Sequence, residues 1–275
     1  MADVSLADIK ALRDRLGTGM VDTKNALVEA EGDIEKAVEI LRLKGAKGNA
    51  KRADRSTSEG LVAAVESATA VTLIELACET DFVAKNEKFV ALADKVVQVL
   101  ADSGAETVDA ALATPAEGGT VASLIEDQAA TIGEKIELRR VVRIPGDHFQ
   151  VYLHQTSKDL PPQIGVAVAF TGDDAETARG IAQHISFADP QYLTREDVPP
   201  SVVENERRIV EEITRNEGKP EAALPKIIEG RLGAFYKQVV LAEQEYARDN
   251  SKTVGQVAKD AGVVVTGFAR FKVGA

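Results

Sequence analysis

The first 45 residues carry apolar side chains at helical spacing in three short stretches. One stripe comprises Leu6, Ile9, Leu12 and Leu16. We expect Gly17 to end this first helix, Thr18 or Asp22 to cap the second, and Gly45 to end the third. Three short helices with glycine at their corners can bury their apolar stripes against one another. The pattern therefore predicts a three-helix module over residues 1–45.

Residues 46–59 interrupt this pattern, because they contain almost no apolar side chain. Their basic residues are Lys47, Lys51, Arg52 and Arg55. A basic stretch invites an RNA-binding interpretation, but no aromatic side chain is present on which a base could stack. We therefore interpret residues 46–59 as a solvated basic linker.

From residue 60 the pattern changes to short apolar runs that alternate with helical segments. The first half has strands at 60–67 and 70–78, helices at 84–101, 108–112 and 121–132, and a returning strand at 136–144. The second half repeats this plan, with strands at 149–154 and 164–170, a helix at 175–185 and a closing strand at 263–273. The repeat predicts an α+β fold with two similar lobes and antiparallel sheets. The first lobe would cover residues 60–145, and the second residues 146–200 and 247–275.

Residues 201–246 are an insertion in the second lobe. Charged residues dominate 201–217, where a narrow apolar face remains, and 224–246 is helical again after the break at Gly218-Lys219-Pro220. Two amphipathic helices joined by a turn predict an antiparallel helical hairpin. Such a hairpin is either a surface for a partner or a second copy, or a self-contained solvated element.

Composition excludes several classes of protein. The formal net charge of −11 argues against a general nucleic-acid binder, because phosphate contacts need a basic face. The one cysteine, Cys78, cannot form an intrachain disulfide and suits a reducing compartment. The acidic start MADVSLADIK has no long apolar core typical of a secretory signal, and no run approaches the roughly 18 apolar residues of a membrane span. We therefore expect a cytoplasmic protein with no membrane or direct nucleic-acid contact.

Candidate catalytic chemistry is scarce. The sequence has no GxxxxGK[ST] phosphate loop, and Gly17-Thr18-Gly19 joins two helices and not a strand to a helix. The histidines His148, His154 and His184 lack metal-ligand spacing, and apolar neighbours favour a buried, inert Cys78. We expect no cofactor, no metal and no enzymatic activity of its own.

The most informative segment is ETDFVAKNEKF, residues 79–89. It follows the apolar run AVTLIELAC and precedes a helical run, so it forms a strand-to-helix corner. At this corner the acidic Asp81 stands beside the large apolar Phe82. Because a corner is exposed, Phe82 is either folded back into the core or presented to a partner.

Six segments in order along the chain resemble the translation elongation factor Ts family. They are LRDRLGTGMVDTKNAL (12–27), GDIEKAVEILRLKG (32–45), ETDFVAKNEKF (79–89), TIGEKIELRR (131–140), EGRLGAFYKQVVL (229–241) and KTVGQVAKDAGVVVTGFARFKVG (252–274). The resemblance implies an N-terminal module similar to ubiquitin-associated domains, a two-lobed core and an inserted helical hairpin. It also implies the activity of a guanine nucleotide exchange factor, which releases GDP from elongation factor Tu during translation elongation.

The resemblance further implies which residues meet elongation factor Tu. The Asp81-Phe82 pair, flanked by Thr80 and Val83, would face its G domain, with Phe82 wedged near the Mg2+ and GDP site. Further contacts map to Ile132, Gly133, His154, Met20, Val21 and Lys24. Alternatively, Met20 and Val21 only staple the second helix, and His154 is a structural residue at a strand end. One protomer per partner and a two-plus-two complex with self-association are both open.

Two functions from other classes are alternatives. An adaptor that binds another protein through its three-helix module would keep its function without residues 46–275. An enzyme with a small-molecule site between its lobes would be stabilised by a metabolite without any protein partner.

Overall fold

Two three-stranded antiparallel sheets form the centre of the molecule, for which a computed structural model describes residues 4–275. The first sheet has the order β1-β2-β5, with β1 (Glu59–Glu66), β2 (Ala70–Cys78) and β5 (Ile136–Pro145). The second has the order β10-β7-β6, with β6 (His148–His154), β7 (Ile164–Thr171) and β10 (Val264–Lys272). In both sheets the second strand along the chain lies in the middle, and the third returns after intervening helices. The mixed α+β class and the antiparallel sheets are confirmed.

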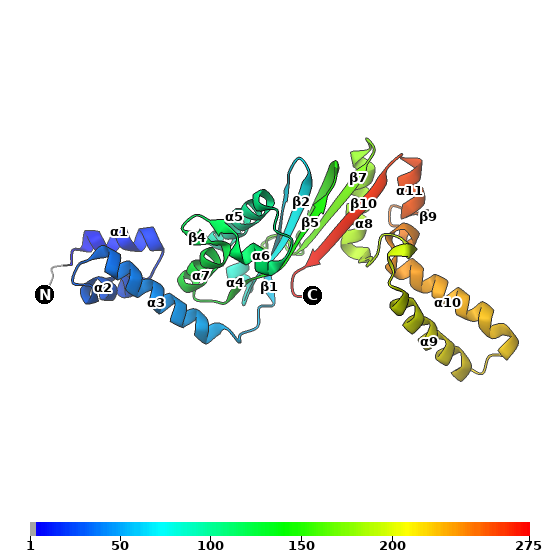
Figure 1. The fold of residues 1–275 in the computed structure, drawn as a ribbon, viewed down its shortest axis with the longest axis horizontal. Helices are drawn as coiled ribbons and strands as arrows, with labels where there is room; N and C mark the ends of the chain where they lie inside the picture. The colour runs from blue at the N-terminus through cyan, green and yellow to red at the C-terminus, as the bar shows by residue number, and fades with distance from the viewer. Residues whose placement is uncertain (1–3) are drawn as a thin grey trace.

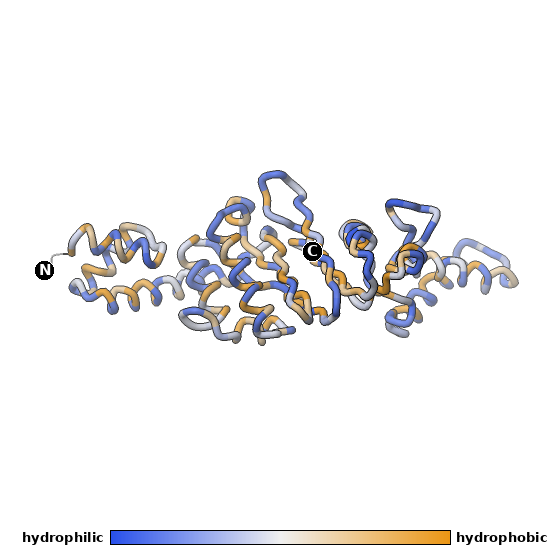
Figure 2. The backbone as a smooth tube through the Cα atoms, turned by 90° about the horizontal axis from the view of Figure 1, so that it is seen from above, coloured by the Kyte–Doolittle hydropathy of each residue, from blue (hydrophilic) through white to orange (hydrophobic). Residues whose placement is uncertain are grey.

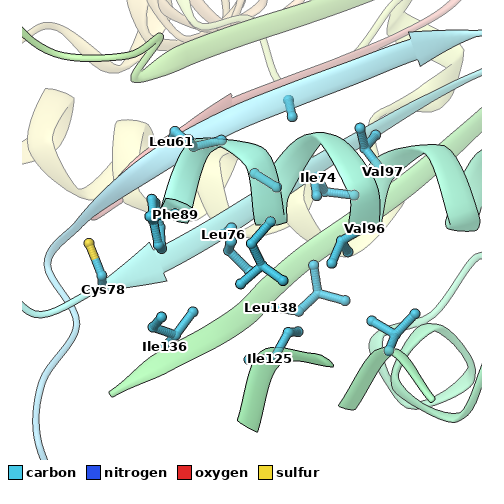
Figure 3. Close-up of a cluster of buried hydrophobic side chains, with 14 of the residues drawn as sticks. Leu61, Ile74, Leu76, Cys78, Phe89, Val96, Val97, Ile125, Ile136 and Leu138 are labelled. Carbon is cyan, nitrogen blue, oxygen red and sulfur yellow. The ribbon is translucent and has the colours of Figure 1, made fainter. Parts of the chain in front are cut away.

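The two sheets pack face to face, which explains why β2 is buried at every position. Its residues alternate between two cores, since successive side chains point to opposite faces of a sheet. Val71 and Leu73 face the second sheet. Ile74 and Leu76 face the helices that cover the first sheet (Figure 3). A continuous apolar run is therefore the pattern that this central strand requires.

Helices cover the outer face of each sheet, so that the order of layers is helices, sheet, sheet, helices (Figure 1). The first sheet is covered by α4 (Asp81–Ala84), α5 (Glu87–Ser103), α6 (Val108–Ala113) and α7 (Val121–Ile132). The second is covered by α8 (Ala175–Ala188) and α11 (Val254–Asp260). Small elements complete the connections: β3 (Pro115–Ala116), β4 (Gly119–Thr120), η1 (Arg195–Asp197), β8 (Glu245–Tyr246) and β9 (Asp249–Thr253).

Three N-terminal helices have a hydrophobic core of their own. They are α1 (Leu6–Leu16), α2 (Met20–Glu29) and α3 (Ile34–Arg52). Gly17 ends α1 in the left-handed conformation, with φ 69°, as expected. The prediction of a side-chain cap on α2 was wrong: its N-cap is Gly19, and the Thr18 hydroxyl instead lies 2.7 Å from that of Thr23.

The third helix does not end at Gly45, as the sequence pattern predicted. It continues to Arg52, so the first half of the basic segment 46–59 is helical. Alanine and lysine favour helix there, and Gly45 lies against α7 instead of forming a turn.

At the opposite end of the elongated molecule, two amphipathic helices run side by side in opposite directions (Figures 1 and 2). These are α9 (Pro200–Asn216) and α10 (Leu224–Val239), joined through the short η2 (Glu221–Ala223). They share a core of Val210, Leu224, Ile228 and Leu232. The second helix was predicted to reach Tyr246 but ends at Val239, followed by η3 (Leu241–Glu243). Val240 is extended, with φ −102° and ψ 115°, and the free Val239 carbonyl accepts hydrogen bonds from the backbone N–H groups of Gln191 and Tyr192. Within residues 4–275, no helix combines the length and apolarity that crossing a bilayer requires.

Candidate functional site

Phe82 lies on the short helix α4 with 73% of its surface exposed. The next two residues, Val83 and Ala84, are buried in the core of the first sheet. Thr80 caps the helix, since its hydroxyl oxygen accepts a hydrogen bond from the Val83 N–H at 3.4 Å. With one side of this single turn anchored in the core, Asp81 and Phe82 face outward. The alternative that Phe82 folds back into the core is therefore excluded.

The corner is fastened to the turn between α7 and β5. The Glu134 carboxylate accepts from the Thr80 hydroxyl at 2.7 Å and from the Thr80 N–H at 3.1 Å. In return, the Glu79 carboxylate accepts from the Lys135 N–H at 2.6 Å. Hydrogen bonds to carboxylates are among the stronger ones in proteins. Two such bonds run from Thr80 to the turn and one runs from the turn to Glu79, so the N-terminal end of α4 is held through both the backbone and the side chain of its capping residue.

Asp81 and Lys85 form an ion pair beside the Phe82 ring. Lys85 Nζ lies 3.2 Å from Asp81 Oδ2 and 4.6 Å from the centroid of the Phe82 ring. The ammonium group therefore contacts the carboxylate and the face of the ring together. Both charged side chains are partly exposed, so the pair adds little stability but fixes where each group lies.

Ile132 and Gly133 lie in the same turn as Glu134. Ile132 is half-buried against the core of the first sheet. Gly133 ends α7 with φ 89° and is exposed, and a Cβ added there would meet no atom within 4 Å. The fold thus brings this turn next to the Asp81-Phe82 corner, although 50 residues separate Phe82 from Ile132 in the sequence.

Met20, Val21 and Lys24 lie on the first turns of α2, and all three are exposed, Val21 by 70%. Exposure of this size argues against the alternative that Val21 only staples its helix, whereas Met20, at 36%, is shielded more. The corner between α1 and α2 packs on α7: the Leu16 carbonyl lies 3.3 Å from the Thr131 hydroxyl, which also donates to the Asp127 carbonyl, and a Cβ on Gly17 would lie 3.0 Å from the Thr131 methyl group. Thr131 precedes Ile132, so α2 begins close to the turn that holds Thr80.

His154 is exposed at the end of β6, where its Nδ1 lies 3.1 Å from the Tyr152 hydroxyl. The following loop contacts the first sheet, since the Pro162 carbonyl accepts from the Val62 N–H at 2.8 Å. Because Glu59 at the start of β1 pairs with Cys78 at the end of β2, this loop lies at the end of the sheets that leads into the Phe82 corner. The structure thus places His154 at the same end of the sheets as Phe82.

Cys78 is fully buried below the corner (Figure 3). Burial, assisted by nearby carboxylates, raises the pKa of its thiol to about 12. The thiol therefore stays protonated at physiological pH and is unsuited to nucleophilic chemistry. Among residues 4–275, no cluster of three histidine, cysteine or acidic side chains is placed to hold a metal ion.

Sequence reasoning missed Glu134, Lys85 and Thr131 as parts of this site. Glu134 stands in the TIGEKI segment and Lys85 in the ETDFVAKNEKF segment. Spacing of four residues on a helix could have suggested the Asp81–Lys85 pair. Nothing in the sequence pattern joins Glu134 to Thr80, because that contact depends on the tertiary fold.

Comparison with known proteins gives one consistent family. The family model described as "Elongation factor TS" matches residues 79–275. A protein named "Elongation factor Ts" from Leifsonia xyli subsp. xyli is 71% identical, with 100% of each chain covered. Proteins of the same name from Clavibacter sepedonicus and Tropheryma whipplei are 68% and 53% identical, also with 100% of each chain covered. The chain belongs to the elongation factor Ts family.

Proposed function

We propose that this protein is a cytoplasmic guanine nucleotide exchange factor for elongation factor Tu in translation elongation. Membership of the elongation factor Ts family supports the assignment. The observation that carries it is the exposed Phe82, presented on a helix turn whose other side is anchored in the core. Its chemistry is binding alone: the protein changes the affinity of its partner for GDP and makes or breaks no covalent bond.

Linkage sets the requirement for exchange. A factor accelerates GDP release only if it binds nucleotide-free elongation factor Tu more tightly than the GDP-bound form. By thermodynamic necessity, GDP and the factor then weaken each other by the same ratio. The contacts that matter are those that displace groups of the GDP site.

Phe82 is suited to this displacement. Burial of its ring in the partner would contribute roughly 1.5–3 kcal/mol, and this free energy can offset the disruption of the Mg2+ and phosphate site. In the proposal the ring inserts between partner side chains near the Mg2+, while Asp81 engages polar groups beside it. A rigid support strengthens the effect, since a ring that must first be ordered would lose part of that free energy.

The remaining contacts provide affinity. Met20, Val21 and Lys24 come from the N-terminal helices, and Ile132 and Gly133 from the α7–β5 turn. His154 comes from the second sheet, and Thr80 and Val83 flank the wedge. These residues would spread the interface over three parts of the molecule. Light scattering on the purified complex would distinguish a one-to-one from a two-plus-two assembly.

The test is the release of a fluorescent GDP from elongation factor Tu after addition of excess unlabelled GDP. Catalytic amounts of the wild-type protein should accelerate release strongly, and Phe82→Ala should lose most of this acceleration. Phe187→Ala is the matched control, because Phe187 is a second exposed phenylalanine, 65% accessible, at the end of α8. It should exchange like the wild type.

Thermal unfolding separates this outcome from misfolding. Phe82 is largely in water already, so its replacement should leave the melting temperature nearly unchanged. Absence of exchange by the wild type would reject the proposed function. Full exchange by Phe82→Ala would reject the role of the ring.

A further inference from the structure

Among the described residues, three hydrogen bonds join the N-terminal helices to the core, and all three end on α7 between Glu126 and Thr131. The Asn49 side-chain amide donates to the Glu126 carbonyl at 2.8 Å, and the Arg52 guanidinium to the Ala129 carbonyl at 3.4 Å. At the other end, the Thr131 hydroxyl shares its proton between the Asp127 carbonyl of its own helix at 2.9 Å and the Leu16 carbonyl at 3.3 Å. The helices α3 and α7 therefore cross at a defined place, with polar contacts on both sides of the crossing.

Gly45 lies at this crossing. A Cβ built on Gly45 would be 2.8 Å from the Cβ of Ala130. Carbon atoms in favourable contact are about 3.5–4.0 Å apart, so any larger residue would push the two helices apart. Neither atom belongs to a flexible side chain that could move aside. Glycine is a poor helix former, yet α3 carries it in its interior at this point of closest approach.

The same helix α7 also holds the Phe82 corner. Its last residue, Ile132, is followed by Gly133 and by Glu134, whose carboxylate binds Thr80. One short helix thus connects the corner between α1 and α2, through the contact of Thr131 with Leu16 and Gly17, with the support of Phe82, through Glu134.

We propose that the Gly45–Ala130 contact is a positioning contact, which sets the distance between the Met20-Val21 corner and Phe82 so that both engage one elongation factor Tu together. This inference rests on the proposed function. Gly45 itself would touch no partner. If the contact is lost, the N-terminal helices stay tethered through residues 53–58 but are no longer held in place. Their effective concentration at the partner then falls, and with it their contribution to the binding affinity. The wedge at Phe82 is unaffected, because the first sheet and Glu134 still support it.

Gly45→Leu tests the contact. In exchange assays with varied elongation factor Tu·GDP, KM should rise about fivefold, a factor typical of coupling between packed residues, while kcat stays unchanged. Ala50→Leu is the matched control, because it adds the same side chain to an exposed position of α3. It should keep the wild-type KM. Phe82→Ala should behave in the opposite way, with a reduced kcat.

An exchange of glycine and alanine between positions 45 and 130 tests the same contact without a large clash. Gly45→Ala and Ala130→Gly should each raise KM, the first by a clash and the second by a gap. The double variant restores one methyl group at the crossing, and its KM should return toward the wild-type value. A merely destabilising effect would add up in the double variant and would not cancel.

The position of the N-terminal helices can be measured directly. Spin labels on Glu39→Cys and Asp94→Cys, both exposed in the wild type, would report the distance between α3 and α5, while the buried Cys78 stays unlabelled. Gly45→Leu should lengthen or broaden this distance. An unchanged distance, or a changed distance with wild-type KM, would overturn the inference. Absence of exchange by the wild type would instead refute the proposed function.

Discussion

At the residue scale, the proposed activity depends on an apolar ring that folding leaves in water. Phe82 keeps 73% of its surface exposed while Val83 and Ala84, on the same turn, are buried. A helix of four residues has no stability of its own, so its shape must come from its surroundings. The two hydrogen bonds from Thr80 to Glu134 supply that support.

Removal of this support should impair exchange without removal of Phe82. Glu134→Ala leaves the Thr80 N–H and hydroxyl without their acceptor, so that α4 becomes mobile. We expect the exchange rate at saturating elongation factor Tu to fall roughly tenfold, the scale set by one charge-assisted hydrogen bond. The measurement is fluorescent GDP release.

Glu117→Ala is the control for Glu134→Ala. Glu117 is an exposed glutamate that pairs with Lys95, with Nζ and Oε2 2.7 Å apart. Equal exchange by the two variants would show that the Thr80–Glu134 contact does not position the ring.

The sequence showed that Phe82 stands at a corner, but it did not decide between core and surface. That choice depends on which side of α4 packs on the first sheet, and on Glu134, which is 54 residues from Thr80. The periodicity of apolar residues indicates only local structure, so it cannot predict a tertiary contact such as the one between Thr80 and Glu134.

At the element scale, a buried histidine connects α8 to the segment that follows the α9–α10 pair. His184 Nδ1 accepts from the Ala247 N–H at 3.3 Å, so the proton is on Nε2, which donates to Gln244 Oε1 at 2.9 Å. The Gln244 amide in turn donates to the Gln238 carbonyl at 2.8 Å. Through Gln244, the neutral ring thus helps to hold the C-terminal end of α10 in place.

Burial lowers the pKa of His184 below its usual value of 6.5, because the charged ring is poorly solvated there. As the pH falls below 6.5, the unfolded chain takes up this proton while the folded protein does not. The free energy of unfolding should therefore fall toward the folded-state pKa, by at most about 1.4 kcal/mol per pH unit from this residue.

Urea unfolding at pH 7.5, 6.5 and 5.5 tests this prediction. His184→Asn should be less stable than the wild type at pH 7.5 but lose less stability on acidification. His148→Asn, at an exposed strand end, should decline like the wild type. If His184→Asn declines as steeply as the wild type, another group causes the pH dependence.

The ends of α1 and α3 show that a glycine in the sequence does not by itself predict where a helix ends. Gly17 and Gly45 were both expected to end a helix, and only Gly17 does so. Gly17 has φ 69°, whereas Gly45 lies inside α3, where the close approach of α7 leaves no room for a side chain. The residue type is the same, and only the neighbouring helix distinguishes the two roles.

At the scale of the whole molecule, a buried carboxylate links the two sheets. Glu75 in β2 is fully buried and faces the second sheet. Its Oε2 lies 2.5 Å from Arg140 Nε, and its Oε1 lies 3.6 Å from Arg139 Nη1 and accepts from the Gly274 N–H at 3.3 Å. Arg140 also donates to the Lys272 carbonyl at 2.6 Å, so the network ties β5 to the end of β10.

Loss of this carboxylate should destabilise the whole core. Glu75→Ala leaves Arg140 without its carboxylate partner, whereas Arg139 keeps Glu137 at 2.9 Å, and we expect the free energy of unfolding to fall by about 2–4 kcal/mol. The lower part of this range allows for the partial exposure of both guanidinium groups. Glu66→Ala, at the exposed end of β1, is the control and should change stability little. Similar losses in the two variants, measured by urea unfolding, would contradict a special role for Glu75.

The repeated order of strands and helices could be read from the sequence, but the packing of one sheet on the other could not. The run AVTLIELAC indicated a buried strand without showing that its two faces meet different layers. The carboxylate of Glu75 in that run has its partners 64 or more residues away. Only the assembled sheets bring Arg139, Arg140 and the end of the chain around it.

The most direct test of the account is the coupling between GDP and this protein on elongation factor Tu. The affinity of elongation factor Tu for GDP would be measured at equilibrium, alone and saturated with the wild-type protein, Phe82→Ala or Phe187→Ala. We predict that the wild type and Phe187→Ala weaken the GDP affinity strongly, and that Phe82→Ala weakens it far less although it still binds. An equal weakening by Phe82→Ala would contradict the account, because the coupling would then arise from contacts other than the exposed ring.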